Sequence, residues 1–596
     1  MVELNKVSQF LMSGCYGIIF GMNNREVAAI FENVADMLAI RGDQIHRVLA
    51  YRRAAENIRE LNRDLNKIHA EGGLTDIPGI GATLAEKIEE MLTTGKLEFY
   101  DRLAQEIPPS LVDMLRVEGV GPKRVKQIYD SLGITTLEEL AEAAEGGRLK
   151  DLPGLGAKSE ARIITGIRAL ELHGDDRVLL GEAWPVAHQI LDELKTLPGV
   201  KQAAVAGSLR RMRETIGDVD ILVAAEDSQP IMAWFREMKN VESVLGSGPT
   251  KSSVLLLSGL QVDLRVLPAE RWGTLLSYFT GGKNHNVRLR ELALKQDLSL
   301  NEHGFTPIQG GPELLCATEE EVYATINMPY IPPVLREDRG EIEAALEDRL
   351  PVPVDLADII ADLHTHTTWS DGRMSVLEMA RAAKERNLEY IVVSDHSVSL
   401  GIANGLSEER LREQAREIKV ADEAMGPDFR ILHGTEMEIK ADGSLDYSDD
   451  VLAELDFVIA SLHTGLRQSR EQVMSRLLTA VENPHVDMIA HPTGRLMPDR
   501  RPADVDMEAL LKAAARTGTI MEINANPQRL DLRDKHARLA RELGVRLAIN
   551  TDAHVDEHFD FMLFGIATAQ RGWVTKYDVV NTWPVDKLMA YVNRDR

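Results

Sequence analysis

The sequence has 596 residues, 44% of them hydrophobic and 27% charged, and a formal net charge of -26 at pH 7. This length predicts several domains rather than one hydrophobic core, and the lack of any apolar run of about 20 residues excludes a membrane protein. Two cysteines exclude a disulfide framework and a thiolate zinc cluster, so a metal site must use histidines and carboxylates, while the acidity argues against nucleic-acid binding through a basic surface.

The chain begins with residues 1–21, which we expect to be a disordered extension or the product of a misassigned start. The LMSGC at residues 11–15 looks like a lipoprotein processing site, but the apolar run before it is far too short for a signal peptide. From residue 22 onward apolar residues recur at helical spacing, which predicts a helical domain over residues 22–95 and a second one over residues 96–175.

Three short Gly-x-Gly turns punctuate these helical domains, each between an apolar anchor and a new helix. They lie in IPGIGATLAEKI (77–88), VEGVGPKRVKQI (117–128) and LPGLGAKSEARI (152–163). One such turn could simply join two helices, but three favour a grip on a phosphate backbone through amides and helix N-termini, which needs no net positive charge. The glycines of these turns are Gly79, Gly81, Gly119, Gly121, Gly154 and Gly156.

Short β-branched runs then predict a sheet domain over residues 176–265. In GDVDIL, Asp218 and Asp220 are two residues apart on a strand, so their carboxylates leave the same face of the sheet, and Asp263 lies in a neighbouring candidate strand. Three hard oxygen ligands suit Mg²⁺ or Mn²⁺, and two such ions can stabilise the attacking and leaving oxygens of phosphoryl transfer. The GSLRR segment at residues 207–211 could cradle a phosphate.

A mixed segment over residues 266–335 and a proline-rich linker over 336–357 lead to the last domain, residues 358–596. There seven apolar strands alternate with amphipathic helices, which predicts a parallel barrel-like sheet with its active site where the strands end. Most of those ends carry a His, Asp or Glu. The nine candidate metal ligands are His364, His366, Asp371, His396, Glu436, His463, His491, Asp552 and His554.

The order GSLRR, GDVDIL, VDLRV and YFTGGKNHN within residues 22–335 resembles the palm and thumb of family X DNA polymerases. The resemblance implies that Asp218, Asp220 and Asp263 bind two metal ions and that Asp263 helps to activate the primer 3′ hydroxyl. It also identifies the Gly-x-Gly turns as helix-hairpin-helix modules that would hold DNA. One departure is Gly282, where the family usually carries serine. The implied nucleotide-binding residues are Gly207, Ser208, Arg211, Gly217, Tyr278, Phe279, Gly281, Asn286 and Arg290.

Lys87, in LAEKIEEMLTTGKLEF, matches the lysine that in the eukaryotic β-type relatives forms a Schiff base with an abasic sugar. The resemblance therefore implies a catalytic lyase lysine, for which a lowered pKa is needed, and the alternative is a plain surface lysine. Arg47, Tyr51 and Lys96 fit a 5′-phosphate pocket, although Thr83 replaces an expected lysine.

The ligand order HxH, D, H, E, H, H, DxH over residues 359–575 resembles the PHP family of polymerase and histidinol phosphatase domains. The resemblance implies a site for up to three Zn²⁺ or Mn²⁺ ions, bridged by Glu436, at which activated water attacks a phosphodiester or phosphomonoester. Arg467 and Arg495, each four residues after a ligand histidine, could bind the substrate phosphate.

A family X polymerase joined to a PHP domain implies a repair enzyme that fills short gaps in base excision repair. The PHP domain would act as a 3′-5′ exonuclease or 3′-phosphatase, with AP-endonuclease activity as a further option. The fold expected is multidomain, α+β and α/β: helical N-terminal domains, a palm with a mixed sheet, a thumb, and a distorted (β/α)7 barrel. We expect gapped or nicked duplex DNA and deoxynucleoside triphosphates as partners, a monomer, and a cytoplasmic location.

Two alternatives stay open. The first is a nucleotidyltransferase acting on RNA ends or small molecules, with a small-molecule phosphatase domain, and the three hairpin turns and YFTGG speak against it. The second is a DNA-end scaffold without catalysis. Its sites should have lost ligands, whereas both metal-ligand sets are complete in this sequence.

Overall fold

The computed structural model describes residues 22–61, 63–117, 120–150, 152–156, 159–160, 163–164, 167 and 177–593. The LMSGC segment and Gly119 lie outside these residues. The chain divides into two compact units, Met1–Asp175 and Asp176–Arg596, and each is described by itself. Among the described residues, no helix has the length and hydrophobicity needed to span a membrane.

The first unit is helical, and one hydrophobic core runs through both of its predicted halves, from Val27 to Ile167. The Gly-x-Gly turns open helices as expected, since Gly81 directly precedes α5 and Gly121 directly precedes α7. The helices are α2 (Asn24–Arg41), α3 (Ile45–Glu60), α4 (Leu65–Ala70), α5 (Ala82–Thr94), α6 (Glu98–Glu106), α7 (Pro122–Leu132) and α8 (Leu137–Glu145), with 3-10 turns η1 (Leu74–Asp76) and η2 (Pro109–Arg116).

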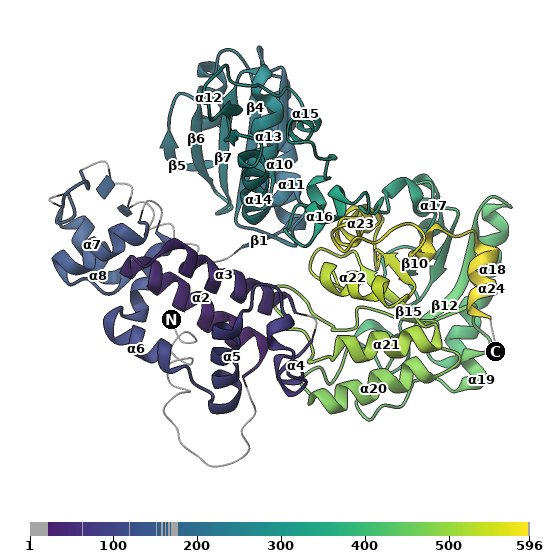
Figure 1. The fold of residues 1–596 in the computed structure, drawn as a ribbon. Helices are drawn as coiled ribbons and strands as arrows, with labels where there is room; N and C mark the ends of the chain where they lie inside the picture. Colours follow the sequence, from purple (N-terminus) through teal and green to yellow (C-terminus); the bar gives the residue numbers. More distant parts are fainter. Residues whose placement is uncertain are drawn as a thin grey trace. The chain divides into compact units, whose positions relative to one another are not determined.

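The second unit opens with the palm, which we define as residues 176–267. Its five-stranded sheet has the order β2-β4-β7-β6-β5, in which β4 and β7 are parallel and the other neighbours antiparallel (Figure 1). In β4, Val219 and all residues from Ile221 to Ala224 are fully buried, so both faces of the second half of the strand pack against other parts of the fold. The elements are β1 (Val178–Leu179), α10 (Leu180–Lys195), β2 (Gln202–Val205), α11 (Gly207–Arg210), β3 (Thr215–Ile216), β4 (Asp218–Ala224), α12 (Gln229–Arg236), β5 (Val241–Ser247), β6 (Lys251–Leu256) and β7 (Gln261–Leu267).

The next segment, residues 268–335, which we call the thumb, is joined by a buried ion pair to the linker over residues 336–357. Arg336 is fully buried, and its guanidinium lies 2.6 Å from the carboxylate of Glu319, which also pairs with Arg210 of the palm at 2.6 Å. The elements are η3 (Ala269–Arg271), α13 (Trp272–Thr280), α14 (Lys283–Leu294), β8 (Leu298–Leu300), β9 (Phe305–Pro307), α15 (Glu319–Thr325), η4 (Pro333–Leu335) and α16 (Glu341–Leu346).

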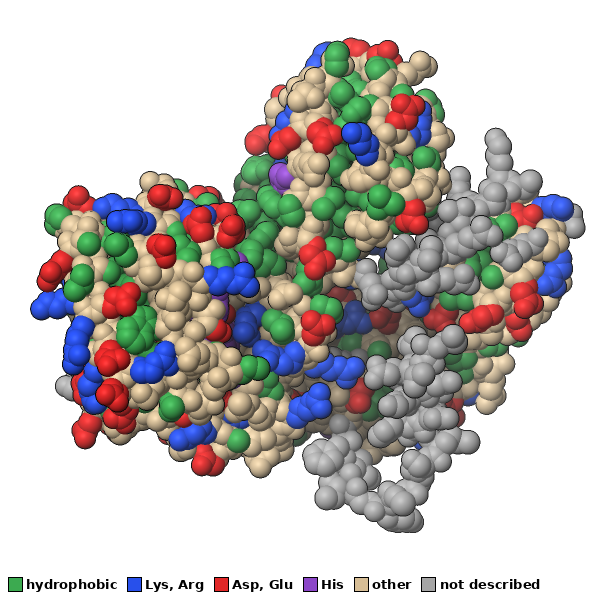
Figure 2. All heavy atoms as spheres, turned by 180° about the vertical axis from the view of Figure 1, so that it is seen from behind, with side chains coloured by type: hydrophobic (Ala, Val, Ile, Leu, Met, Phe, Trp, Pro, Cys, Tyr) green, Lys and Arg blue, Asp and Glu red, His purple; other side chains and the backbone are tan. Residues whose placement is uncertain are grey.

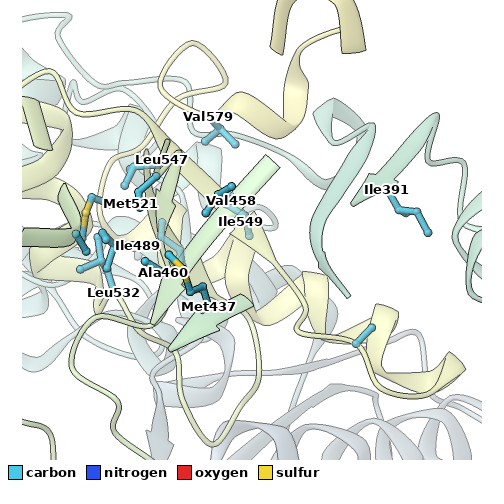
Figure 3. Packing of buried hydrophobic residues seen from close by; sticks show 14 of the residues in the cluster. Ile391, Met437, Val458, Ala460, Ile489, Met521, Leu532, Leu547, Ile549 and Val579 are labelled. Carbon is cyan, nitrogen blue, oxygen red and sulfur yellow. The ribbon is translucent and has the colours of Figure 1, made fainter. Parts of the chain in front are cut away.

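The barrel domain, residues 358–593, contains seven parallel strands in sequence order. A parallel bridge between Thr365 and Ala553 brings the first strand beside the segment after the last, so the sheet nearly closes. Figure 3 shows side chains such as Val458, Ile489 and Ile549 packed together in its core. The strands are β10 (Ala361–Thr365), β11 (Tyr390–Val393), β12 (Arg430–Glu438), β13 (Phe457–Ser461), β14 (Met488–Ile489), β15 (Ile520–Asn524) and β16 (Leu547–Asn550).

Helices cover the outside of these strands, and capping side chains start several of them. Ser375 and Ser469 close capping boxes at the starts of α17 and α20, which stabilise helix N-termini by about 1 kcal/mol each. The helices are α17 (Val376–Glu385), α18 (Glu408–Met425), α19 (Asp449–Leu452), α20 (Arg470–Glu482), α21 (Met507–Thr517), α22 (Asp534–Glu542), α23 (Met562–Arg571) and α24 (Val585–Val592), with η5 (Leu356–Asp358), η6 (Gly401–Ala403), η7 (Asp556–Phe561) and η8 (Val580–Thr582).

The palm and the barrel domain share a hydrophobic core within the second unit. Leu530 and Phe564 of the barrel domain pack into the cluster that contains Leu180 and Ala183 of α10. At Gly181 an added Cβ would lie 2.5 Å from Pro527, so only glycine permits this approach. The palm and the barrel domain are therefore in close contact at α10.

Candidate active sites

The palm brings its three candidate metal ligands to adjacent positions on one sheet. Asp218 and Asp220 lie at the start of β4, and Asp220 is paired in register with Asp263 of the neighbouring parallel strand β7. Asp263 accepts a hydrogen bond from Gln261 at 3.0 Å and lies 2.8 Å from the ammonium of Lys251 on β6. Sequence reasoning missed Lys251, because its approach depends on the pairing of β6 with β7.

The shifted pKa values of Asp220 and Asp263 are those expected where carboxylates share a cation. Partial burial and the neighbouring carboxylates of Asp218 and Asp263 raise the pKa of Asp220 to about 7. Burial would also raise the pKa of Asp263, but hydrogen bonds from Lys251 and Gln261 bring it below the ordinary value. A divalent cation between the carboxylates would offset the burial and the repulsion that raise the pKa of Asp220, so the donor set fits Mg²⁺ or Mn²⁺.

The predicted phosphate turn lies against this acidic group. Gly207 has a φ of +61°, and an added Cβ would lie 2.4 Å from a carboxylate oxygen of Asp220. Glycine is therefore required for both the conformation and the close approach. Ser208 follows in the first turn of α11, and Gly217 directly precedes β4.

Arg211 connects the phosphate turn to the YFTGG segment. Its guanidinium donates to the carbonyl of Thr280 at 2.6 Å and to that of Gly281 at 3.3 Å, and it pairs with Glu337 at 2.9 Å. Within the thumb, Asn286 donates to the carbonyl of Tyr278 at 2.6 Å. The remaining predicted residues lie beside them: Phe279 has its ring 5.2 Å from that of Tyr278, and Arg290 lines one small cavity with Tyr278 and Asn286.

The barrel domain gathers all nine predicted ligands into overlapping groups at the carboxyl ends of its strands. Within each group the potential ligand atoms lie within 4.8 Å of one another. The groups are His366, Asp371, His396 and His554; His364, Glu436 and His491; His364, His366 and Asp552; and His396, Glu436 and His463.

Glu436 is the centre of this cluster. Its carboxylate oxygens lie 2.9 Å from His396 and from His491, 3.3 Å from His463 and 3.4 Å from His364. Burial and the neighbouring imidazoles of His554 and His396 lower the pKa of His366 to about 3, so that ring is neutral and able to coordinate.

Several buried nitrogen and oxygen atoms of this cluster lack a hydrogen-bond partner, which indicates whether the cluster suits metal ions. In the described part of the chain, Nε2 of His364, His366 and His491 and Oε1 of Glu436 are buried without a hydrogen-bond partner. Such atoms are costly unless something binds them. Imidazole and carboxylate donors at these separations fit Zn²⁺ or Mn²⁺, with several ions in one pocket.

Three further carboxylates hold the ligands in place, and sequence reasoning missed them. Glu522 lies 2.7 Å from Nδ1 of His364, and Glu438 lies 2.9 Å from Nδ1 of His463. Asp395 accepts hydrogen bonds from Thr367 and Ser370 in the loop after β10. Carboxylates of this kind fix the ring orientation of metal-binding histidines. Their positions at the ends of predicted strands could have indicated them in the sequence.

The two arginines predicted to bind phosphate have different surroundings. Arg467 is exposed. Arg495 is buried and bonds Glu214 of the palm at 2.8 Å and the carbonyls of Arg529 and Leu530. Arg529 lies closer to the ligands, with its Nε 3.5 Å from a carboxylate oxygen of Asp552.

Phe99 lies among the residues of the first unit that were predicted to form a 5′-phosphate pocket or to act as the lyase lysine. The cations of Arg47 and Lys87 lie 5.0 and 4.9 Å from the centre of its ring, and Tyr51 stacks on it at 6.0 Å. Lys96 is exposed just beyond the end of α5. Phe99 was not predicted, because only the fold brings α6 beside α3 and α5.

The Gly-x-Gly turns present open backbone. At Gly81, Gly121, Gly154 and Gly156 an added Cβ would meet nothing within 4 Å, whereas at Gly79 it would press on Arg53 and Asn57. Gly154 has a φ of +77°, a backbone conformation that favours glycine. Packing against the described residues does not explain Gly81, Gly121 and Gly156, whereas an approaching phosphate backbone would.

Comparison with known proteins agrees with this geometry. Family models match as follows: a helix-hairpin-helix domain over residues 22–97, a SAM-like helix-hairpin-helix tandem over 111–169, the DNA polymerase beta thumb over 275–337, and the PHP domain over 362–526. A protein of Bacillus subtilis named DNA polymerase/3'-5' exonuclease PolX is 38% identical over 578 residues, which cover 96% of this chain and 100% of the relative. The chain belongs to the PolX family. The predictions of a family X polymerase with a PHP domain, of the fold class and of an enzyme are thereby confirmed.

Two further relatives each match one part of this PolX-family chain. A protein of Thermoanaerobacter sp. (strain X514) named probable phosphatase is 30% identical over 251 residues, 40% of this chain and 96% of that protein. DNA polymerase lambda of Rattus norvegicus is 25% identical over 345 residues, 53% of this chain and 56% of the relative.

The structure explains why this PolX-family chain carries Gly282 where serine is usual. An added Cβ would lie 2.6 Å from the carbonyl oxygen of Arg336, which already accepts a hydrogen bond from the Gly282 amide at 3.1 Å. Because the Arg336 side chain is buried and paired with Glu319, the carbonyl cannot move freely.

Gly282→Ser is therefore expected to destabilise the protein by about 1–3 kcal/mol through overpacking, without lowering the KM for nucleotide. Thermal denaturation and steady-state gap filling measure the two effects. The matched control is Gly246→Ser, because a Cβ there meets no atom closer than 3.7 Å. An unchanged melting temperature with a lower KM would mean that the serine fits and restores a phosphate contact.

Proposed function

We propose that this protein is a DNA-directed DNA polymerase that fills short gaps and carries a 3′-5′ exonuclease and 3′-phosphatase in its PHP domain. The observation that supports this most directly is the presence of two separate sets of side chains suited to bind metal ions: Asp218, Asp220 and Asp263 in the palm and nine candidate ligands in the barrel. The name of the Bacillus subtilis relative states both activities for that protein.

In the palm, we assign Ser208 and Arg211 to the triphosphate and Tyr278 and Phe279 to the sugar of the incoming deoxynucleotide. The bond from Arg211 to the Thr280 carbonyl sets the separation between these two parts of the pocket. We assign Asp263 to help activate the primer 3′ hydroxyl by accepting its proton. Bound Mg²⁺ or Mn²⁺ would supply charge neutralisation and alignment of the reacting groups.

In the barrel, we assign the ligand groups to two or three Zn²⁺ or Mn²⁺ ions, which would supply Lewis-acid activation of water when bound. Glu436 would bridge them, since four of the ligand histidines surround it. Glu522 and Glu438 hold His364 and His463 in the tautomers that leave Nε2 free for a metal. Arg529, rather than Arg495, is our candidate for the substrate phosphate.

The partner would be gapped or nicked duplex DNA, held by backbone amides at the Gly-x-Gly turns. The protein would bind it as a monomer, in the cytoplasm. Figure 2 shows acidic and basic side chains interspersed over most of the face that it presents. Binding through amides, helix N-termini and bound cations suits a chain with a net charge of -26. Whether Lys87, beside Phe99, cleaves abasic sugars is a separate hypothesis that borohydride trapping would test.

One substrate tests the two-site proposal: a one-nucleotide gap whose primer ends in a 3′ phosphate. With Mn²⁺ and no nucleotide, the 3′ hydroxyl primer should accumulate, and with the complementary deoxynucleotide the primer should lengthen by one residue. A single chain brings both sites to one DNA end at high effective concentration, so no free hydroxyl intermediate should build up. Extension confined to primers supplied with a 3′ hydroxyl would contradict the phosphatase assignment.

A further inference from the structure

Glu214 lies in the palm, between the phosphate turn and the catalytic strand β4, yet its partners come from the barrel domain. Its two carboxylate oxygens accept hydrogen bonds from Arg495 at 2.8 Å and from Arg533 at 2.6 Å. The Arg495 side chain is 6% exposed and that of Glu214 is 27% exposed. Burial would raise the pKa of Glu214, but the two guanidinium groups hold it below the ordinary value. The ion pair is therefore charged and largely shielded from water, which strengthens it.

Arg495 carries this contact into the barrel active site. The same guanidinium donates to the backbone carbonyls of Arg529 and Leu530, in the loop between β15 and α22. Arg495 itself lies four residues after His491, one of the metal ligands. One side chain thus joins two active-site loops, and Glu214 holds that side chain from outside the barrel domain.

Arg529 is the residue whose position this arrangement fixes. Its Nε lies 3.5 Å from the metal ligand Asp552, and its Nη1 is buried without a hydrogen-bond partner among the described residues. A guanidinium with an unused N–H beside a metal cluster is suited to a phosphate oxygen.

We propose that Glu214 of the polymerase half is a positioning residue of the phosphoesterase site. It orients Arg495, Arg495 fixes the backbone of Arg529, and Arg529 binds the phosphate of the substrate. The barrel site is then incomplete without the palm, although every metal ligand lies in the barrel. This inference rests on the phosphoesterase function proposed above.

The test uses the full-length chain with Mn²⁺ and an oligonucleotide that carries a 3′ phosphate. Glu214→Gln keeps the size of the side chain and removes its charge. We expect KM to rise about tenfold with kcat within twofold, because a ground-state phosphate contact is weakened. Glu214→Asp should recover part of the affinity. Glu226→Gln, the same change at an exposed palm residue, is the matched control and should leave KM unchanged.

A binding measurement separates positioning from catalysis. Titration calorimetry with inorganic phosphate should show affinity reduced by the same factor in Glu214→Gln and in Arg529→Met. If Glu214→Gln fails to fold, Arg495→Lys takes its place with the same expected result. This change keeps the positive charge but removes the planar guanidinium that donates to several acceptors at once. Unchanged KM and phosphate affinity in a folded Glu214→Gln protein would overturn the proposal. So would an Arg529→Met protein with wild-type phosphate affinity. Lack of 3′-phosphatase activity in the wild-type protein would instead refute the proposed function.

Discussion

Asp220→Asn is expected to abolish gap filling, with a loss of about 10³-fold or more in kcat/KM. Asp220 lies beside Asp218 and Asp263 in the sheet and against the turn at Gly207, so it would contact both the bound cations and the nucleotide that we propose there. Loss of a ligand that organises metal charge costs several kcal/mol of transition-state stabilisation, and each 1.36 kcal/mol is a factor of ten. Extension of a one-nucleotide gap with a 3′ hydroxyl primer measures the effect.

Exonuclease activity supplies one control for this variant, because the barrel ligands are unaffected and should keep their activity. Asp227→Asn, the same change at an exposed palm residue, supplies another and should extend primers normally. Extension by Asp220→Asn at more than a few percent of the wild-type rate would show that the palm carboxylates do not organise the reaction.

The same substitution should stabilise the metal-free protein. In the folded protein the pKa of Asp220 is about 7, above its ordinary value of 3.8, so the folded protein holds an extra proton between these two pH values. Stability therefore falls as the pH rises through that window, and the full cost is present at pH 8. Asp220→Asn removes a cost on the order of 1–2 kcal/mol after allowance for solvent screening. Calorimetry at pH 8 in EDTA should show a higher melting temperature for the variant, and saturating Mg²⁺ should reverse the order.

Much of the chemistry could be predicted from the sequence, because the chemical groups lie at fixed positions in local patterns. The two-residue spacing of Asp218 and Asp220 on a strand determines that they share a face, whatever the rest of the fold does. The strand-end positions of His364 and His396 likewise determine that they meet at one end of a parallel barrel. These predictions required only the secondary structure and the direction of the strands.

Contacts made across the fold could not be predicted in this way. Lys251 reaches Asp263 only through the pairing of β6 with β7, and Phe99 reaches Lys87 only through helix packing. Arg495 was expected at the substrate phosphate because it follows His491 by four residues, yet its main carboxylate partner is Glu214, 281 residues away. No periodicity in the sequence encodes a separation of that length.

Glu436→Gln is expected to abolish 3′-phosphatase and exonuclease activity while primers with a 3′ hydroxyl are still extended. Four histidines of the cluster have a ring nitrogen within 3.4 Å of this carboxylate, so the neutral amide removes the charge that would hold two or more cations together. We expect a loss of at least about 10³-fold, by the same conversion of several kcal/mol into rate.

The outcome on the gapped substrate with a 3′ phosphate is the most informative, because the two sites act there in sequence. Glu436→Gln should neither expose the hydroxyl nor extend the primer, and the addition of Asp220→Asn protein should restore extension by supplying the missing phosphatase in trans. The exposed barrel residue Glu454 offers the matched control, since Glu454→Gln should behave as wild type. If the folded Glu436→Gln protein also failed to extend the 3′ hydroxyl primer, the two reactions would have to share one metal site. The proposal of separate metal sites in the palm and the barrel would then be wrong.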